Sequence, residues 1–151
     1  KGWLDRVLVN GIAYGKGMRL DTGGLKGRRA MLAMTTGCYP EMVAEGGLLG
    51  ALDVSLWHLH SGTLAYTGFE VLEPFVAWSA HYNEREVLAD YLDAYAGRMR
   101  TLWTETPMFF HPQADFGTDW RLRPGIQARA VGQQASQRGY GQFPGPFGPS
   151  R

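Results

Sequence analysis

This chain of 151 residues has little cysteine, no long apolar run and a small net charge. Each of these features argues against a class of protein or partner. Cys38 is the only cysteine, so an internal disulfide framework and a multi-cysteine zinc site are excluded. No apolar run approaches the roughly 20 residues of a membrane-spanning helix, and no signal peptide is visible. The net charge of +1 gives no reason to expect nucleic acid or another strongly acidic partner. The composition that remains suits a soluble protein of the reducing cytoplasm.

The first residues have the pattern of a helix that the sequence enters midway. Trp3, Leu4, Val7 and Leu8 follow helical spacing, yet neither a capping residue nor an initiator methionine precedes them. We therefore expect this sequence to be the C-terminal part of a longer protein whose earlier strands are not included.

The most informative stretch begins with the apolar run Ala30–Met34, which ends at Thr35-Thr36-Gly37. It predicts a buried strand that runs into a loop. In open α/β sheets ligands bind at the carboxyl ends of strands, and threonine hydroxyls with N–H groups around a glycine can bind the polar edge of a flat heterocycle. The alternative interpretation is a plain strand end.

A glycine-rich segment, residues 11–18, precedes that strand and predicts a surface loop. Loops carried on a rigid sheet often hold binding residues. We interpret Tyr14 in this loop either as a lid over a pocket or as an exposed aromatic side chain with one face packed.

Helices and strands alternate in the middle of the chain. Leucines at helical spacing predict a helix over residues 48–66, and residues 69–78 predict a strand whose Pro74 favours a strand end or an edge position. Asn83, with Glu86 in a capping box, predicts the start of a long helix that ends near Trp103. Such alternation indicates an α/β fold with a parallel sheet and helices on both faces. About two strands and three helices are too few to complete that sheet, so only its C-terminal part is expected here.

Proline and glycine dominate after Thr106 and predict an irregular C-terminal extension, with one short helix over residues 125–136. We divide the chain into residues 1–105, the C-terminal part of the α/β domain; residues 106–139, the irregular extension; and residues 140–151, a disordered tail. One Arg-Gly-Tyr-Gly motif in that tail does not change the expectation that the protein binds no nucleic acid.

Several of these segments together resemble the C-terminal half of the NAD(P)H:quinone oxidoreductases, which are flavodoxin-like flavoproteins with a doubly wound parallel sheet. The resemblance covers about the first 120 residues without evident gaps. It rests on the following motifs: Lys1-Gly2-Trp3-Leu4-Asp5-Arg6-Val7-Leu8, Ile12-Ala13-Tyr14, Leu25-Lys26-Gly27-Arg28-Arg29-Ala30, Thr35-Thr36-Gly37, Leu56-Trp57, Gly68-Phe69-Glu70-Val71-Leu72-Glu73-Pro74, Leu102-Trp103 and Pro107-Met108-Phe109-Phe110.

The resemblance implies a cytoplasmic homodimer that binds FAD noncovalently, with FMN as the alternative flavin. It implies that NAD(P)H donates a hydride to the flavin and that a quinone then takes two electrons at the same place, a ping-pong mechanism. The loop formed by Thr35, Thr36, Gly37 and Cys38 corresponds to the one that holds the flavin ring. Tyr14 and Tyr66 correspond to residues that reach over from the partner subunit and cover the substrate pocket.

The sequence departs from this family at three places around the expected site. Val43 and Leu49 occupy the positions of a tyrosine and a histidine proposed to relay a proton and charge to the flavin, and neither side chain can donate a hydrogen bond. Lys16 replaces a second covering tyrosine. If Lys16 faces the pocket it supplies a cation near the reduced flavin or an anionic quinol; the alternative is a solvated loop lysine.

Other chemistry finds little support in the sequence. His58 and His60 would point roughly 200° apart on a helix, so no metal site is expected. Cys38 is interpreted as a packed side chain, with a reactive thiol beside the flavin as the alternative. For the function, the alternatives to the oxidoreductase are a noncatalytic dimeric binding or scaffold protein of the same fold and an inactive truncated fragment; this fragment alone is expected to be inactive.

Overall fold

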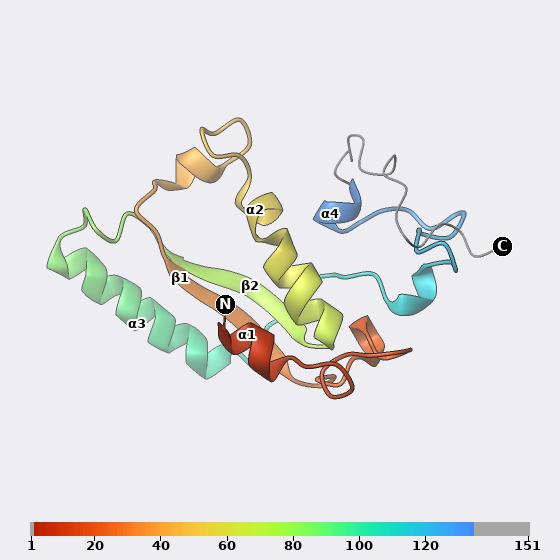
Figure 1. Cartoon of the computed structure of the whole chain (residues 1–151). Helices are drawn as coiled ribbons and strands as arrows, with labels where there is room; N and C mark the ends of the chain where they lie inside the picture. Colours follow the sequence, from red (N-terminus) through yellow and green to blue (C-terminus); the bar gives the residue numbers. More distant parts are fainter. Residues whose placement is uncertain (1, 135–151) are drawn as a thin grey trace.

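The computed structural model of the protein describes residues 2–134, which form a small α/β structure around two strands (Figure 1). The strands are β1 (Arg29–Thr35) and β2 (Glu70–Ala77). The α-helices are α1 (Gly2–Val7), α2 (Leu52–Leu59), α3 (Arg85–Thr101) and α4 (Val131–Gln134). Shorter helical turns are η1 (Leu20–Thr22), η2 (Pro40–Val43), η3 (His60–Leu64), η4 (Ala65–Thr67) and η5 (Gln113–Asp115). Among these helices none has the length and apolar character needed to cross a bilayer.

The two strands pair in parallel, as the alternation of helices and strands predicts. The register shifts between Met31 and Ala33, so that Glu73 and Pro74 together oppose a single residue of β1. Pro74 therefore lies in a bulge within β2 rather than at a strand end, which is the other position where a sheet tolerates a residue without an N–H. Arg98 of α3 donates hydrogen bonds to the carbonyls of Glu73 (2.6 Å) and Pro74 (3.1 Å).

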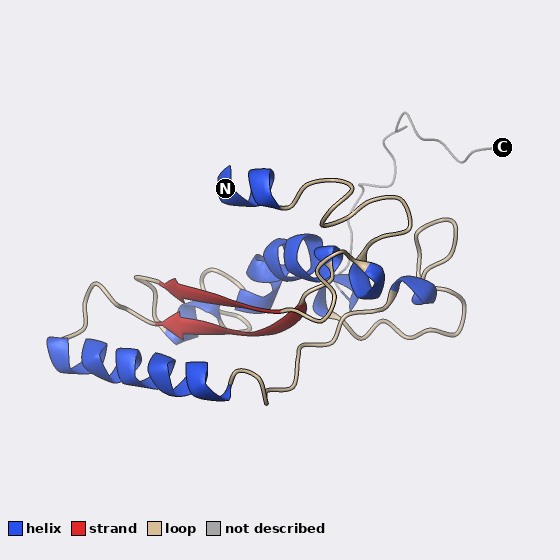
Figure 2. Cartoon of the chain, turned by 90° about the horizontal axis from the view of Figure 1, so that it is seen from below, coloured by secondary structure: helices blue, strands red, loops and turns tan. Residues whose placement is uncertain are grey.

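Helices cover both faces of this pair of strands, as Figure 2 shows: α2 and the turns after it lie on one side, and α3 lies on the other. The core lies between the strands and the turns η3 and η4 that follow α2, where Leu64 and Ala65 pack with Val71. Burial of such side chains, worth roughly 1.5–3 kcal/mol for a large aliphatic one, fixes the position of α2 on the sheet. No residue of α3 is buried to the same degree.

The helix predicted over residues 48–66 is shifted in the structure. It begins at Leu52, because Gly50 has φ +74° and the preceding turn is held by the N–H of Leu49, which donates to the carbonyl of Met42 at 2.7 Å. The helical path continues beyond α2 through η3 and η4 until Gly68, whose φ of +102° ends it.

The predicted cap of the long helix is wrong. The α3 helix begins at Arg85 after Glu84, and the side chain of Asn83 donates instead to the carbonyl of Trp78 at 2.8 Å. The helix ends at Thr101, near the predicted end. Asn83 closes the turn between β2 and α3 rather than starting the helix.

The segment after α3 packs along the sheet and is largely irregular. The N–H of Met108 donates to the carbonyl of Val71 at 2.8 Å, which attaches this segment to β2. Of the predicted helix over residues 125–136, the described part is helical only in α4, and residues 135–136 lie outside the described residues. Gly132 of α4 lies so close to the ring of Trp57 that a Cβ would not fit between them. The expectation of a disordered tail over residues 140–151 lies outside the described residues.

Candidate functional site

The loop that follows β1 is tied to the loop that follows β2 by three backbone hydrogen bonds. The N–H of Thr36 donates to the carbonyl of Ala77 at 3.1 Å. In return, the N–H of Ala80 donates to the carbonyl of Thr36 (3.0 Å) and that of Ser79 to the carbonyl of Cys38 (3.2 Å). Ser79 has φ +51°, an uncommon conformation for a residue other than glycine. The carboxyl ends of both strands thus form one connected platform.

The residues of this platform, Thr35, Thr36, Gly37 and Cys38, differ in which backbone N–H groups are available to a ligand. The N–H of Cys38 donates to Oγ1 of Thr36 at 3.1 Å, and that oxygen lies 2.6 Å from Sγ of Cys38. The N–H of Gly37 has no acceptor among the described residues, and no atom lies within 4 Å of the place where its Cβ would stand. Gly37 is therefore the position where the platform has both a free donor and open space.

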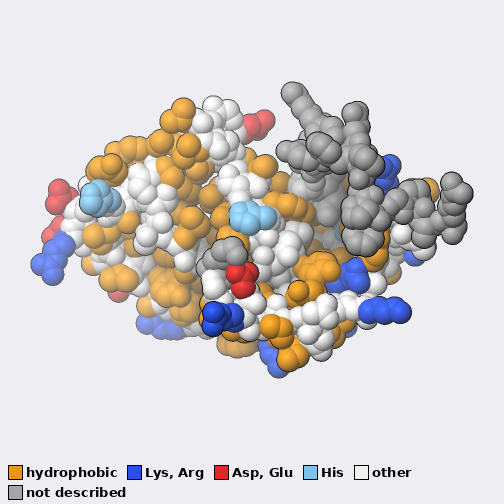
Figure 3. Space-filling view, in the orientation of Figure 1, with side chains coloured by type: hydrophobic (Ala, Val, Ile, Leu, Met, Phe, Trp, Pro, Cys, Tyr) orange, Lys and Arg blue, Asp and Glu red, His pale blue; other side chains and the backbone are white. Residues whose placement is uncertain are grey.

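Apolar side chains surround this end of the sheet, as the hydrophobic surface in Figure 3 shows. Val43 is half-buried at the end of η2, and Leu49 is 55% exposed in the turn before α2. Other exposed apolar and aromatic side chains lie in the segments that follow the two strands and in the first turn of α2: Tyr39, Leu48, Val54 and Tyr82. A flat apolar ring or another polypeptide chain can be accommodated on such a surface.

The structure brings the two predicted covering residues together. The ring centroids of Tyr14 and Tyr66 are 5.7 Å apart, with the rings tilted by 57°. Tyr14 is held by the N–H of Gly11, which donates to its carbonyl at 2.7 Å, and Tyr66 lies in η4. Both rings line a cavity of about 480 Å³, with Leu4 and Asp5 of α1 in its wall.

Lys16 comes two residues after Tyr14 in the sequence and does not line that cavity. It occupies the tip of a turn in which the N–H of Gly15 donates to the carbonyl of Met18 (2.8 Å) and the N–H of Met18 donates back (3.1 Å). Lys16 is exposed, and no described carboxylate is paired with its ammonium group.

The platform and the tyrosine pair lie at opposite ends of the sheet. Tyr66 comes just before β2, whereas Thr35 pairs with Ala77 at its other end. The eight residues of β2 span about 23 Å at roughly 3.3 Å per residue. One flat ring on the platform of a chain therefore cannot contact the tyrosine pair of the same chain.

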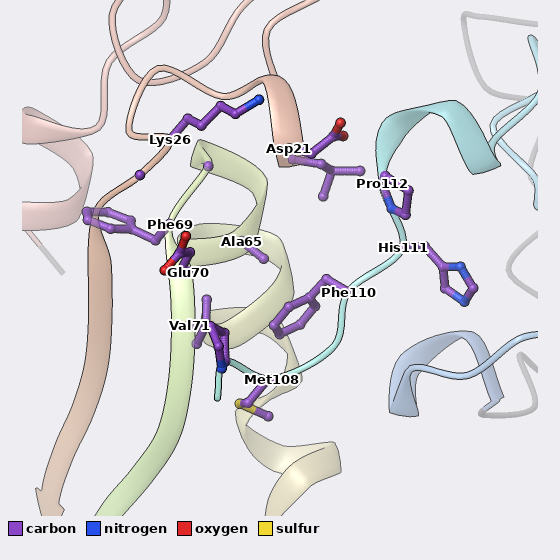
Figure 4. Close-up of a pocket in the computed structure, with 14 residues that line it drawn as sticks. Asp21, Lys26, Ala65, Phe69, Glu70, Val71, Met108, Phe110, His111 and Pro112 are labelled. Atoms are coloured by element: carbon purple, nitrogen blue, oxygen red, sulfur yellow. The ribbon is translucent and has the colours of Figure 1, made fainter. Parts of the chain in front are cut away.

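Figure 4 shows a further pocket, of about 250 Å³, that the sequence analysis does not include. Its apolar wall is formed where Met108 and Phe110 pack beside β2, and Lys26, Asp21 and Glu70 supply its charges. Both carboxylates are engaged: Asp21 accepts from the N–H of Gln113 (2.7 Å), and Glu70 accepts from Nε of Arg29 (3.1 Å). The first contact ties the extension to η1, and the second joins the two strands. In the sequence, only the apolar run after Pro107 hints at this packing.

Both ring nitrogens of the buried His111 are engaged in this region. Nδ1 lies 2.7 Å from Oδ2 of Asp115, and Nε2 accepts from the N–H of Arg129 at 3.2 Å. Because an accepting Nε2 carries no proton, the proton of the neutral ring is assigned to Nδ1, which donates to Asp115. His111 therefore fixes the extension and has no free nitrogen for acid–base chemistry.

His58 and His60 do not face a common ligand. His58 is exposed, whereas His60 is buried in η3 and its Nε2 has no hydrogen-bond partner. Burial lowers the pKa of His60 below its ordinary value of 6.5, and the carboxylate of Asp53 opposes this shift. Within residues 2–134 no group of three or more metal-binding side chains is arranged to hold an ion.

One family model and several known proteins match this chain. The sequence profile of the flavodoxin-like fold family matches residues 1–99. NAD(P)H dehydrogenase [quinone] 1 of Cavia porcellus is 33% identical over 121 residues, which are 80% of this chain and 44% of that protein. Ribosyldihydronicotinamide dehydrogenase [quinone] of Mus musculus is 38% identical over 112 residues, 74% of this chain and 48% of that protein. A Klebsiella pneumoniae structure described as a quinone reductase aligns with a TM-score of 0.76 at 34% identity, covering 85% of this chain and 55% of that one. The chain thus spans about half the length of the curated relatives it matches.

Proposed function

The chain belongs to the flavodoxin-like fold family, and from this premise we propose that it is part of a flavin-dependent oxidoreductase that transfers a hydride from NAD(P)H to a quinone. The names of the relatives supply the reaction class, because NAD(P)H and a quinone stand in the first and a quinone in the others. The observation in this chain that supports it is the platform at the carboxyl ends of the strands, with the free N–H and open space at Gly37. Ligands of open α/β sheets bind at that end.

The residues of the platform fit a flavin, which we propose to be FAD, with FMN as the alternative. When bound, a flavin accepts a hydride and passes two electrons to the acceptor. Gly37 would donate its N–H to the acceptor edge of the ring and stabilise negative charge that develops there. The N–H of Cys38 already donates to Thr36, so these two residues would hold the loop in shape rather than bind the ring directly.

Tyr14 and Tyr66 would cover the place where the nicotinamide and then the quinone bind in turn, which is a ping-pong sequence. Aromatic faces favour stacking with flat rings. Because the length of β2, about 23 Å for its eight residues, separates the tyrosine pair from the platform of its own chain, we propose that the pair covers the platform of a second subunit. The enzyme would thus be a homodimer with sites shared between subunits, and its lone cysteine suits the reducing cytoplasm.

Absorbance spectroscopy of the purified full-length protein tests this proposal. We expect a visible flavin band at about one flavin per subunit, bleached by NADH under anaerobic conditions and restored by a quinone. A protein that purifies with the fold intact but binds no added FAD or FMN contradicts the oxidoreductase proposal. That outcome favours the noncatalytic dimeric binding protein, which is consistent with apolar Val43 and Leu49 beside the platform.

A further inference from the structure

A second, smaller cavity lies next to the tyrosine pair and shares Tyr66 with it. It has a volume of about 150 Å³. Arg19 and Leu20 reach it from the loop after Tyr14, and Phe116 and Trp120 reach it from the C-terminal extension. The cavity thus combines three aromatic side chains with one cation.

The guanidinium of Arg19 is largely unmatched by the protein. Its Nη2 donates to the carbonyl of Gly15 at 3.2 Å, but its Nε is buried without any hydrogen-bond partner. No carboxylate of the described residues lies within ion-pair distance of it. The carbon Cζ stands 4.7 Å from the centre of the Trp120 ring, which holds the group in place by a cation–π contact. A positioned cation therefore has donors to spare.

The backbone around this cavity is also unusual. Leu20 has φ +51° and Trp120 has φ +63°, and residues with a side chain rarely adopt these left-handed conformations. Such conformations concentrate at ligand-binding sites. Two of the three non-glycine residues with positive φ in the described part of the chain line this one cavity.

We propose that this cavity is an anion subsite of the electron-acceptor pocket, in which Arg19 binds an acidic substituent of a flat acceptor that lies against Tyr14 and Tyr66. The planar fork of a guanidinium matches two oxygens of a carboxylate or a sulfonate. A volume of 150 Å³ holds such a substituent, since one water molecule takes up about 30 Å³ of liquid. The inference rests on the proposed function, because it assumes that the tyrosine pair covers an acceptor.

Equilibrium binding to the full-length, flavin-loaded protein tests the subsite. The probes are 1,4-naphthoquinone and 1,4-naphthoquinone-2-sulfonate, titrated by calorimetry. We expect the sulfonate to bind about tenfold more tightly, as for one hydrogen-bonded charge pair. Arg19→Met should bring the ratio of the two dissociation constants close to one, and Arg19→Lys should restore part of it. Arg100→Met, an exposed arginine on the other side of the sheet, is the matched control and should leave the ratio as it was.

The natural sequence provides a readout that depends on no variant. Raising the ionic strength should reduce the preference for the sulfonate, because salt screens a partly exposed ion pair. Melting temperatures of all variants report whether Arg19→Met keeps its fold. If that variant unfolds, a sulfonate preference of the natural sequence that does not change with salt still overturns the subsite.

The remaining outcomes separate this inference from the proposed function. A sulfonate preference that survives in folded Arg19→Met overturns the subsite, while binding of both quinones still supports the oxidoreductase. Failure to bind either quinone overturns both. The 2′-phosphate of NADPH carries similar chemistry, so a change in the NADPH-to-NADH preference of Arg19→Met without a change in the sulfonate ratio assigns Arg19 to the donor and overturns its assignment to the acceptor.

Discussion

Gly37 is the residue on which the proposed flavin contact depends most directly. Apart from its two chain neighbours, no described residue has an atom within 4 Å of a Cβ placed at this position. Its backbone is nevertheless fixed between Thr36 and Cys38, which are bonded to each other and to the turn after β2. A side chain at position 37 should therefore be tolerated by the fold and rejected only by a ring that lies against the loop.

Gly37→Val should expel the flavin while the protein stays folded. The measurement is the ratio of visible to ultraviolet absorbance after gel filtration, with circular dichroism as the check on the fold. Gly97→Val is the control, because Gly97 on α3 also has no neighbour within 4 Å of a Cβ position and lies on the other side of the sheet. Stoichiometric flavin in Gly37→Val would show that the ring binds elsewhere.

We expect the apolar Val43 and Leu49 to slow reduction of the proposed flavin. Neither donates a hydrogen bond, and a positioned donor to a developing anion is worth roughly 2.7–4 kcal/mol at the upper end. Replacing both, as Val43→Tyr with Leu49→His, should accelerate reduction by NADH by about a hundredfold or more in stopped-flow measurements. Lys16→Ala in the natural background should slow reduction if the ammonium reaches the pocket. An unchanged rate in the double variant means that this step is not limited by the missing donors.

Among the secondary-structure elements, the continuous path from α2 through η3 carries a charge-sensitive group into the core. His60 is buried and its pKa lies below the unfolded value of 6.5, chiefly because burial disfavours the cation. A lowered folded-state pKa means that the unfolded chain binds the proton first. Its contribution to stability is therefore complete above about pH 6.5 and is lost as the pH falls through the lowered value.

Urea unfolding of the full-length protein between pH 7.5 and 5 should show this dependence on pH. The free energy of unfolding should fall below about pH 6.5, with a slope of at most about 1.4 kcal/mol per pH unit from this residue. His60→Leu should flatten the slope, whereas His58→Leu, two positions away and exposed, should keep it. Equal slopes in the two variants would assign the pH dependence to other groups.

Element positions could be predicted from the sequence where local pattern and packing agree. The apolar runs around Ala30 and Val71 predict β1 and β2 to within one residue at each end, because a buried strand extends little beyond its apolar run. The start of α2 and the cap of α3 could not be predicted. Gly50 can lie inside a helix or in the turn before it, and Asn83 can cap a helix or close a turn. Hydrogen bonds to the carbonyls of Met42 and Trp78 select the turn in both cases, and the sequence pattern does not show these contacts.

The candidate site could be predicted from the sequence only in part. The sequence singles out Thr35–Cys38 and the Tyr14–Tyr66 pair, because they lie in the segments that carry the family resemblance. The sequence gives no sign of the Arg19 cavity, because Arg19 and Trp120 are far apart in the chain and meet only when the extension packs against the loop. No local pattern distinguishes this arginine from the other basic residues.

At the scale of the whole molecule, a large exposed apolar area should govern how readily the chains associate. β1 has one unpaired edge among the described residues, β2 has only the hydrogen bond from Met108 to Val71 on its side away from β1, and α3 exposes Leu92 at 69%. Leu48 at 81% and Trp103 at 70% add to this surface. Bare strand edges and large apolar patches favour association between chains.

Residues 1–151 expressed alone should therefore be poorly soluble or molten. The expected signs are binding of a hydrophobic dye, broad thermal unfolding and aggregation in analytical ultracentrifugation. The full-length protein under the same buffer conditions is the control. A monomeric fragment with a sharp, cooperative melting transition would show that the exposed edges need no cover.

The separation of the platform from the tyrosine pair has a genetic consequence. Gly37→Val damages only the platform of a subunit, and Tyr14→Ala with Tyr66→Ala damages only its cover. If sites are shared, a mixed dimer of these two inactive variants keeps one site with neither lesion. Equal co-expression should then restore about a quarter of the natural number of sites, because about half of randomly formed dimers are mixed and each has one intact site of two. Two mutant alleles that complement each other in this way would locate the active site between subunits without any structure of the complex.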